Sequence, residues 1–275
     1  MRKRFGPDES PRPGATPPGL RPSGNETPTS SDGPGEPGPS GSSPEPALLA
    51  AYRLSRHHFG HLGWWPGETP FEICVGAILT QNTSWRNVER AIGQLKAAGA
   101  LDAHTLFALP VERLAQLIRP SGYYNVKARR LRAFLTVLVQ QFDGAVDRML
   151  AGATPAVRER LLAIPGIGEE TADSILLYAG EHEVFVVDAY TRRACARHAW
   201  CAPDIPYGDL QRLCARAFSR VETADRLDLL RDAHAQWVMI GKDFCRPRAP
   251  RCDGCPWRGL LPAGDLRPGV TVTRG

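Results

Sequence analysis

The turn Ile164-Pro165-Gly166-Ile167-Gly168 constrains this chain more than any other segment, because apolar residues at helical spacing lie on both sides of it. Two glycines in one short turn remove the Cβ barrier, so the backbone can approach a ligand closely. The unpaired amides at the start of the second helix are electropositive and suit a phosphate. The pattern predicts a helix-hairpin-helix over residues 157–179, a clamp on a DNA backbone that does not read base sequence. Many tight turns between helices carry Gly-x-Gly without touching DNA, so the turn alone leaves both interpretations open.

A carboxylate lies about twenty residues beyond this turn. Asp188 follows four consecutive apolar residues, Val184 to Val187, and is expected to emerge from a buried segment at the wall of a cleft. Cleavage of a glycosidic bond builds oxocarbenium character on the sugar, and a nearby carboxylate can stabilise that charge and orient or deprotonate water. The commoner role for such a residue is the N-cap of a helix, here one that starts near Ala189. Spacing alone does not decide between these two roles.

Four blocks of this sequence resemble the endonuclease III superfamily of helix-hairpin-helix DNA glycosylases, in that family's order, from residue 47 to about 261. The blocks are residues 72–83, residues 122–128, the turn at 164–168 followed by Val186-Val187-Asp188, and Cys245-x6-Cys252-x2-Cys255. The resemblance implies an all-α fold in which two helical lobes hold double-stranded DNA in the cleft between them. It also implies that Asp188 is the catalytic aspartate of an enzyme that removes damaged bases in base excision repair.

The chain begins with a segment that cannot bury enough apolar surface to fold. Twelve of the 25 prolines fall in residues 1–46, among Gly, Ser, Thr and Glu, and this composition predicts a disordered tail. From residue 47 onward the apolar period is mostly helical, with one strand-like segment at 183–187, so the fold is predicted to be all-α. The resemblance places residues 71–183 in a helical barrel lobe, residues 47–70 and 184–262 in a second lobe with the cysteine loop, and residues 263–275 in a flexible tail.

Helices are expected wherever apolar residues recur at this spacing. The run at 71–79 is nearly all apolar, so its helix is expected to be central and buried. The other expected helices begin near residue 48 or cover residues 88–95, 111–118, 128–142, 210–218 and 227–240.

Net charge and cysteine content bound the partners and the compartment. The formal net charge is +5 and the pI is near 8.9, which is compatible with a polyanionic partner but does not demonstrate one. No run of about 18 apolar residues occurs, so no membrane partner is expected. Seven cysteines, three of them clustered, favour a reducing compartment over a disulfide framework. The expectation is a cytoplasmic protein that acts as a monomer.

The chain departs from the bifunctional members of the superfamily at one position. Those members carry a lysine two residues after the last glycine of the hairpin, where it forms a Schiff base with the sugar and goes on to cleave the strand. Here Glu169 and Glu170 follow Gly168, and a carboxylate cannot form an imine. The sequence therefore predicts a monofunctional glycosylase that uses water and has little or no lyase activity. The two glutamates also suit the positive end of a helix, and both roles can hold together.

Three of the six tryptophans lie on either side of the apolar helix at 71–79. Indoles beside an apolar helix are often core, and composition leaves that alternative open. An extruded base must be stacked between aromatic faces, and a Trp face attracts the positive charge of an alkylated purine. A Trp-Trp-Pro segment before Leu-Thr-Gln-Asn-Thr is similar to the branch called 3-methyladenine DNA glycosylase III, which implies alkylated purines as substrates. The expected base-pocket residues are Trp64, Trp65, Gln81, Trp85 and Tyr124.

The resemblance also assigns residues that contact the DNA. Asn82 occupies the position whose side chain enters the gap left by the flipped nucleotide, and Tyr123 stands where a leucine wedge is usual. Lys127 is expected to contact a phosphate. The remaining expected contacts come from the hairpin and the helix that follows it: Pro165, Gly166, Ile167, Gly168 and Thr171.

The spacing Cys245-x6-Cys252-x2-Cys255 resembles the start of the superfamily's [4Fe-4S] loop. A fourth cysteine should follow after five residues, but that position holds Leu261. Three thiolates can hold a labile cluster with an exogenous or oxygen ligand. A three-iron cluster, a zinc ion with a fourth ligand from elsewhere, or no metal at all are the alternatives.

Two other functions compete with a monofunctional enzyme for alkylated purines. One is an endonuclease III-like glycosylase that removes oxidised pyrimidines and has lyase activity from another amine. The other is a non-catalytic protein that binds DNA lesions. Asp188 argues against the non-catalytic protein, and Glu170 argues against the lyase.

Overall fold

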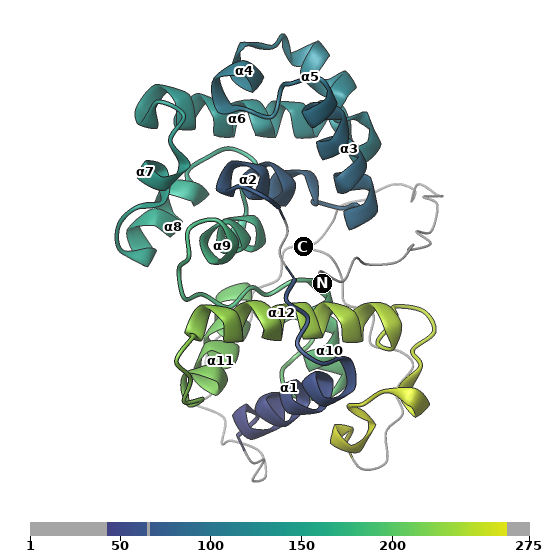
Figure 1. Cartoon of the computed structure of the whole chain (residues 1–275). Coiled ribbons are helices and arrows are strands. Elements are labelled where there is room, and N and C mark those ends of the chain that lie inside the picture. Colours follow the sequence, from purple (N-terminus) through teal and green to yellow (C-terminus); the bar gives the residue numbers. More distant parts are fainter. Residues whose placement is uncertain (1–42, 65–66, 263–275) are drawn as a thin grey trace, which may run out of the picture.

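The computed structural model describes residues 43–64 and 67–262, and all regular secondary structure within these ranges is helical (Figure 1). This confirms the predicted all-α class. The longer helices are α1 (Glu45–Phe59), α2 (Pro70–Leu79), α3 (Trp85–Ala97), α6 (Tyr124–Phe142), α8 (Thr154–Leu162), α9 (Glu169–Tyr178), α10 (Ala189–Arg197), α11 (Tyr207–Ser219) and α12 (Arg226–Asp243). The shorter ones are α4 (Ala103–Ala108), α5 (Val111–Leu117), α7 (Val146–Leu150) and the 3-10 turns η1 (Arg119–Ser121), η2 (Cys252–Gly254) and η3 (Arg258–Leu260). Among these helices, none combines the length and the apolar character needed to cross a bilayer.

The helices form two lobes, each around its own hydrophobic core (Figure 1). Helices α2 to α9 make up the first lobe. The second lobe combines α1 with α10, α11 and α12, so both ends of the described chain contribute to it. Its core includes the aromatic side chains of Phe185, Trp237 and Trp257, all of which are buried.

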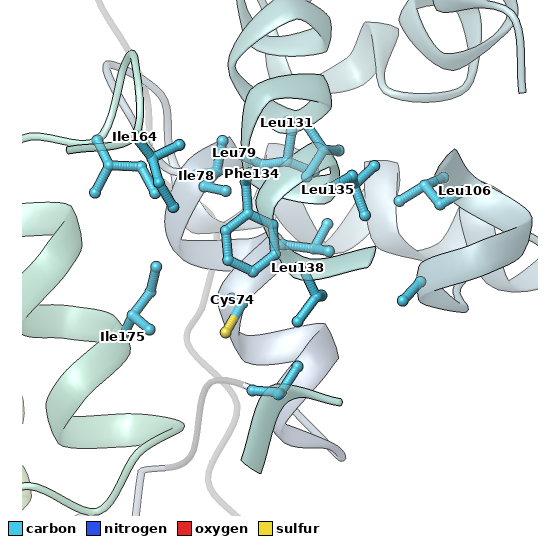
Figure 2. Packing of buried hydrophobic residues seen from close by; sticks show 14 of the residues in the cluster. Cys74, Ile78, Leu79, Leu106, Leu131, Phe134, Leu135, Leu138, Ile164 and Ile175 are labelled. Atoms are coloured by element: carbon cyan, nitrogen blue, oxygen red, sulfur yellow. The ribbon is translucent and has the colours of Figure 1, made fainter. Parts of the chain in front are cut away.

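Helix α2 is mostly buried because its sequence is apolar on nearly every face. Pro70 occupies its first position, and the Thr69 side chain caps it by accepting from the Glu72 amide at 3.1 Å. Cys74 and Ile78 have no exposed surface, and Figure 2 shows them in the core with side chains of α6 and α9. Full burial of an aliphatic side chain of this size stabilises the fold by roughly 1.5–3 kcal/mol.

Helices α2 and α9 lie at the boundary between the two cores. Ile73 belongs to the second core, whereas Cys74 belongs to the first. The same change occurs between Leu176 and Leu177 of α9. Adjacent residues of a helix point about 100° apart, so each of these helices lines both cores at once. Helix α9, which follows the predicted hairpin, is therefore placed where the lobes meet.

The segment at 183–187, which the sequence predicts as a strand, is a non-helical connection that pairs with no strand within the described ranges. Phe185, Val186 and Val187 are buried, which accounts for the apolar run. Side chains of α11 bond its backbone: Gln211 Nε2 donates to Phe185 O at 3.0 Å, and Val187 N donates to Tyr207 Oη at 3.2 Å. The strand prediction is wrong because an apolar run indicates burial without indicating which groups satisfy the backbone.

Two predicted boundaries also differ from the structure. Helix α1 begins at Glu45, inside the predicted tail of residues 1–46, and the Glu45 carboxylate anchors it through Arg216 Nε at 2.9 Å. Helix α6 begins at Tyr124, four residues before the predicted start at residue 128. Residues 1–42 of the predicted N-terminal tail and the predicted C-terminal tail at 263–275 lie outside the described residues.

Lys127 ties α6 to the ends of two neighbouring elements. Its side chain is buried, and Nζ donates to Leu79 O at 2.8 Å and to Ser121 O at 2.6 Å. Burial, together with the charge of Arg130, lowers the pKa of Lys127 to about 8. The prediction that Lys127 contacts a phosphate is wrong, because its ammonium group is buried and already bonded to two carbonyl oxygens.

Replacement of Lys127 by methionine is expected to lower the free energy of unfolding by roughly 1–3 kcal/mol, because two buried carbonyl oxygens lose their donor. Urea denaturation measures this change. The control is Arg129→Met, an exposed position on the same helix, where a change within about 0.5 kcal/mol is expected. Unchanged stability, with a DNA-binding salt slope reduced by about 1, would instead restore Lys127 as a phosphate contact.

Candidate functional site

The predicted hairpin joins α8 to α9 and turns at Gly166. This residue has a φ of +91°, and a Cβ there would collide with the Arg130 side chain, so glycine is required. Ile167 is buried in the first core and anchors the turn. Pro165, Gly166 and Gly168 are exposed, and a Cβ at Gly168 would meet no atom within 4 Å. The backbone around Gly168 is therefore open to a ligand from outside.

Gln81 connects the loop after α2 to the hairpin. Its Nε2 donates to Gly166 O and to Thr171 Oγ1, both at 3.0 Å, and its Oε1 accepts from Arg130 Nη1. The amide therefore uses both of its donor hydrogens inside the protein. The sequence places Gln81 in the base pocket and Thr171 at the DNA; the structure places both in the contacts that hold the hairpin against the first lobe.

Arg158 and Asp173 hold the two helices of the hairpin motif together. Arg158 Nε of α8 lies 2.7 Å from Asp173 Oδ1 of α9, and Asp173 is fully buried. The other carboxylate oxygen accepts from Gln211 Nε2 of α11 at 2.7 Å. Removal of one partner of such a buried pair is strongly destabilising, so this tie fixes α9 against both α8 and α11. No sequence motif indicated it.

Asp188 is the N-cap of α10. Its Oδ1 accepts from the Thr191 amide at 2.7 Å, and its Oδ2 lies 3.6 Å from His234 Nε2 of α12. Burial acts to raise the pKa of the Asp188 carboxyl, but His234 and the Thr191 amide favour the charged form, and its pKa lies below the ordinary value. Asp188 is therefore a buried carboxylate that partners on two helices keep ionised, and capping uses only one of its oxygens.

His234 links Asp188 to the aromatic side chains between the lobes. Its Nδ1 lies 2.6 Å from Tyr178 Oη, and its Nε2 faces Asp188. Both Tyr178 and His234 are buried. No sequence motif indicates His234, because a histidine inside a helix belongs to no motif. The available signal was a titratable residue on an otherwise apolar face of α12.

Glu170 lies in the first turn of α9, and its surroundings differ from those of Glu169. Its side chain is accessible to water, yet desolvation by the surrounding protein and the nearby Asp188 charge raise its pKa to about 7, with Arg192 acting in the opposite direction. Glu169 instead pairs with Arg158 Nη2 at 3.4 Å. Glu170 and Asp188 thus form a pair of carboxyl groups whose pKa values are shifted in opposite directions.

Trp64, Trp85 and Tyr178 form an aromatic cluster where the two cores meet. The Trp64 ring lies 5.7 Å from the Trp85 ring and 5.3 Å from the Tyr178 ring, edge to face in both cases. Trp85 packs against the first core and Trp64 against the second, and both are half-buried. The structure thus brings together two of the predicted base-pocket tryptophans and joins them through Tyr178 to His234. Trp65, predicted for the same pocket, lies outside the described residues.

Two exposed residues next to α2 and α6 have a left-handed backbone. Asn82 has a φ of +56° and Tyr123 a φ of +46°. Asparagine tolerates this conformation, whereas for tyrosine it is strained and persists only because the surrounding structure imposes it. Tyr123 is 67% exposed, although its ring is large. These are the two residues that the sequence assigns to the interior of the DNA, while the adjacent Tyr124 is half-buried against the first core.

Cys245, Cys252 and Cys255 lie around one cavity after α12. Leu261 also lines this cavity. Arg197 Nη1 donates to Cys245 Sγ at 3.4 Å. Within residues 43–64 and 67–262, no group of three or more His, Cys, Asp or Glu side chains is arranged to hold a metal ion. The three thiols therefore share a space without the close approach of a site for one ion.

Comparison with known proteins identifies a family and several proteins that this chain resembles. Residues 75–220 match the family described as HhH-GPD superfamily base excision DNA repair protein. Over 210 residues the chain is 40% identical to "Putative DNA repair glycosylase MJ1434" of Methanocaldococcus jannaschii, covering 76% of this chain and 93% of that protein. The structure is similar to H. pylori 3-methyladenine DNA glycosylase (MagIII) bound to 1,N6-ethenoadenine, with a TM-score of 0.61 and 28% identity over 72% of this chain and 96% of that one. It shares its fold with a trapped endonuclease III–DNA covalent intermediate, with a TM-score of 0.67 and 21% identity over 78% and 94% of the two chains.

Proposed function

The chain belongs to the HhH-GPD superfamily of base excision DNA repair proteins, and from this premise we propose that it is a monofunctional DNA N-glycosylase for alkylated purines. One observation carries the proposal. The starts of α9 and α10 present two carboxyl groups in different environments, Glu170 and Asp188, and the first of them stands where bifunctional members carry lysine.

The lysines of the chain support hydrolysis by water. The sequence has four, of which three lie in the described residues. Lys96 Nζ pairs with Glu72 Oε2 at 2.9 Å, and Lys127 Nζ is buried against two carbonyl oxygens. Lys242 lies in the last turn of α12, next to the cysteine loop. None of these three amines is on α9 or α10, which carry the two carboxyl groups, so attack on the sugar by an amine is not favoured.

In this mechanism Asp188 stays ionised and stabilises the positive charge that develops on the deoxyribose. The Thr191 amide and His234 already hold the carboxylate in place, so no reorganisation is needed when the sugar charge appears. The same partners lower its pKa, which makes Asp188 a weak base near neutral pH. Its work is therefore electrostatic.

Glu170 accepts the proton of the attacking water. A pKa of about 7 suits proton transfer near neutral pH, and its side chain is accessible to water. The water oxygen bonds to C1′ of the sugar while the bond between C1′ and the base nitrogen breaks. The electron pair of the broken bond goes to the base, which an alkylated purine accepts readily because it is positively charged. The water proton passes to the Glu170 carboxylate.

The aromatic cluster supports a flat, electron-poor base as substrate. Trp64 and Trp85 are half-buried and lie next to the chain from Tyr178 through His234 toward Asp188. An indole face attracts a cationic ring more strongly than an aliphatic side chain does. The H. pylori relative, 28% identical, is a 3-methyladenine glycosylase bound to a modified adenine. These observations favour alkylated purines over oxidised pyrimidines.

The proposal predicts the products of the reaction. Incubation with methylated duplex DNA should release free 3-methyladenine and leave abasic strands uncut, and borohydride should trap no protein–DNA adduct. Mass spectrometry of the released bases and a denaturing gel measure both results. Release of oxidised pyrimidines with strand cleavage and a strong adduct would contradict the proposed substrate and mechanism. Binding of lesion DNA without release of any base would indicate a non-catalytic protein.

Asp188→Asn separates the charge of this residue from its cap, because an asparagine side chain also accepts from the Thr191 amide. We expect single-turnover excision to fall about 100-fold or more, since transition-state stabilisation is lost. Affinity for lesion DNA should stay within a few-fold, because this charge acts on the transition state rather than on the bound substrate. The control Asp188→Ala also loses the cap, at a cost of about 0.5–2 kcal/mol in stability. Excision by the Asn variant within tenfold of the wild type would leave Asp188 only its role as a cap.

The pH dependence of excision tests Glu170 as the proton acceptor. Because the carboxylate must be ionised to accept a proton, the single-turnover rate should rise with pH through about 7 and then level off. Glu170→Gln should lower the rate by about 10²–10⁴ and remove this rise. Glu169→Gln is the matched control from the same helical turn and should keep the wild-type profile. A Glu170→Gln enzyme that retains the wild-type pH profile would rule out this role.

Substitution of Trp85 distinguishes base recognition from packing. If its ring stacks on the base, Trp85→Leu should lose about 1–3 kcal/mol of stacking, and Trp85→Phe should retain part of it. The advantage of Phe over Leu should be larger for cationic 7-methylguanine than for neutral 1,N6-ethenoadenine, because only an aromatic face attracts the charge. Excision rates on both substrates and a melting curve for each variant measure this. Equal rates for Phe and Leu with sharply lowered melting temperatures would make Trp85 a core residue.

A further inference from the structure

One buried histidine lies in the wall of the cysteine cavity. His198 follows the last residue of α10 and lines this cavity together with Cys245, Cys252 and Cys255. It is only 7% exposed, and its Nδ1 is buried without a hydrogen-bond partner among the described residues. A buried ring nitrogen without a partner costs free energy, so this atom needs an explanation. Imidazole nitrogen is one of the common metal ligands in proteins.

His198 lies close to the position where the fourth cysteine is missing. The His198 ring interacts with the backbone of Leu260, the residue directly before Leu261. Metal-ligating histidines typically donate one N–H to a carbonyl or carboxylate and keep the lone pair of the other nitrogen for the metal. Leu261 has no atom that could serve as a ligand.

Two aromatic rings and a neighbouring arginine fix this wall of the cavity. The His198 ring stacks on Trp200 with 4.6 Å between centroids and meets the buried Trp257 edge to face at 5.7 Å. Arg197 donates to Cys245 Sγ at 3.4 Å and to Arg246 O at 2.6 Å. These contacts hold the Arg197 side chain between the end of α10 and the cysteine loop.

We propose that His198 is the fourth protein ligand of a [4Fe-4S] cluster whose other ligands are Cys245, Cys252 and Cys255. A cluster fits these residues better than a single ion does. The three thiols surround a common cavity without approaching as closely as the ligands of one ion, and a cluster binds each ligand to a different iron. Imidazole ligation of iron–sulfur clusters has a precedent in Rieske centres, where it raises the reduction potential. The cluster would join the end of α12 to the end of α10.

Anaerobic reconstitution of the full chain with ferrous iron and sulfide tests this assignment. The wild type should take up four irons and four inorganic sulfides per chain. After reduction, pulsed electron paramagnetic resonance on protein labelled with nitrogen-15 histidine should show a nitrogen strongly coupled to the cluster. His198→Cys should keep the cluster, lose the nitrogen coupling and show a lower reduction potential, because a thiolate replaces the neutral ring.

His198→Ala should bind iron more weakly and release it faster to a chelator, and Leu261→Cys added to it should restore retention. His57→Ala, an exposed position on α1, is the control for a generic loss of histidine. The cysteine replacement and the double variant keep the test informative if His198→Ala fails to fold. A cluster without nitrogen coupling that survives His198→Ala unchanged would overturn the role of His198. Uptake of zinc without sulfide, or of no iron at all, would overturn the cluster itself.

Discussion

The buried carboxylate of Asp188 is the interaction on which the arrangement of this site depends. A charge removed from water must be compensated by partners, and Asp188 finds them on two helices: the Thr191 amide in the first turn of α10, and His234 of α12. His234 in turn contacts Tyr178 at the end of α9. Three helices that meet at the boundary of the two cores are thus oriented around one negative charge. The partners that keep Asp188 ionised also hold its carboxylate in place, so in the proposed mechanism it is already positioned to stabilise a positive charge on the sugar.

The same charge also contributes to the raised pKa of Glu170. Two carboxyl groups near one another cannot both ionise easily, so the one with the better partners keeps its charge and the other holds its proton to higher pH. Asp188 has the partners, and desolvation together with the Asp188 charge raises the pKa of Glu170 to about 7. A lysine at position 170 would be attracted to Asp188 instead. The exchange of lysine for glutamate therefore changes the proposed chemistry from attack by an amine to activation of water, without any change in the fold that carries it.

The sequence indicated the elements whose structure depends on local pattern. The apolar run of α2, the two glycines of the hairpin and the carboxylate before α10 are local signals, and each occurs where it was expected. What it did not indicate are contacts between distant segments. The apolar segment at 183–187 is bonded by side chains of α11 rather than by a strand, and Lys127 bonds two carbonyls inside the first lobe. His234 pairs with Asp188, more than forty residues away in the sequence, and the partners of Asp173 lie on other helices. No rule of residue spacing predicts such contacts.

Lys127 is buried, yet it holds in place two chain ends that lead into exposed loops. Its two acceptors, Leu79 O and Ser121 O, lie just before the loops that carry Asn82 and Tyr123, the two exposed residues with left-handed backbone. Gln81, beside Asn82, bonds the hairpin at Gly166 O. Lys127 thus joins the ends of α2 and η1, and Gln81 joins the loop after α2 to the hairpin, so the two loops and the hairpin form one platform. Strain at an exposed tyrosine persists only on such a support, because a mobile loop would relax to an ordinary conformation. A rigid platform suits the entry of side chains into a duplex. Binding free energy can then offset the cost of unstacking a base, because none of it is used to deform the protein.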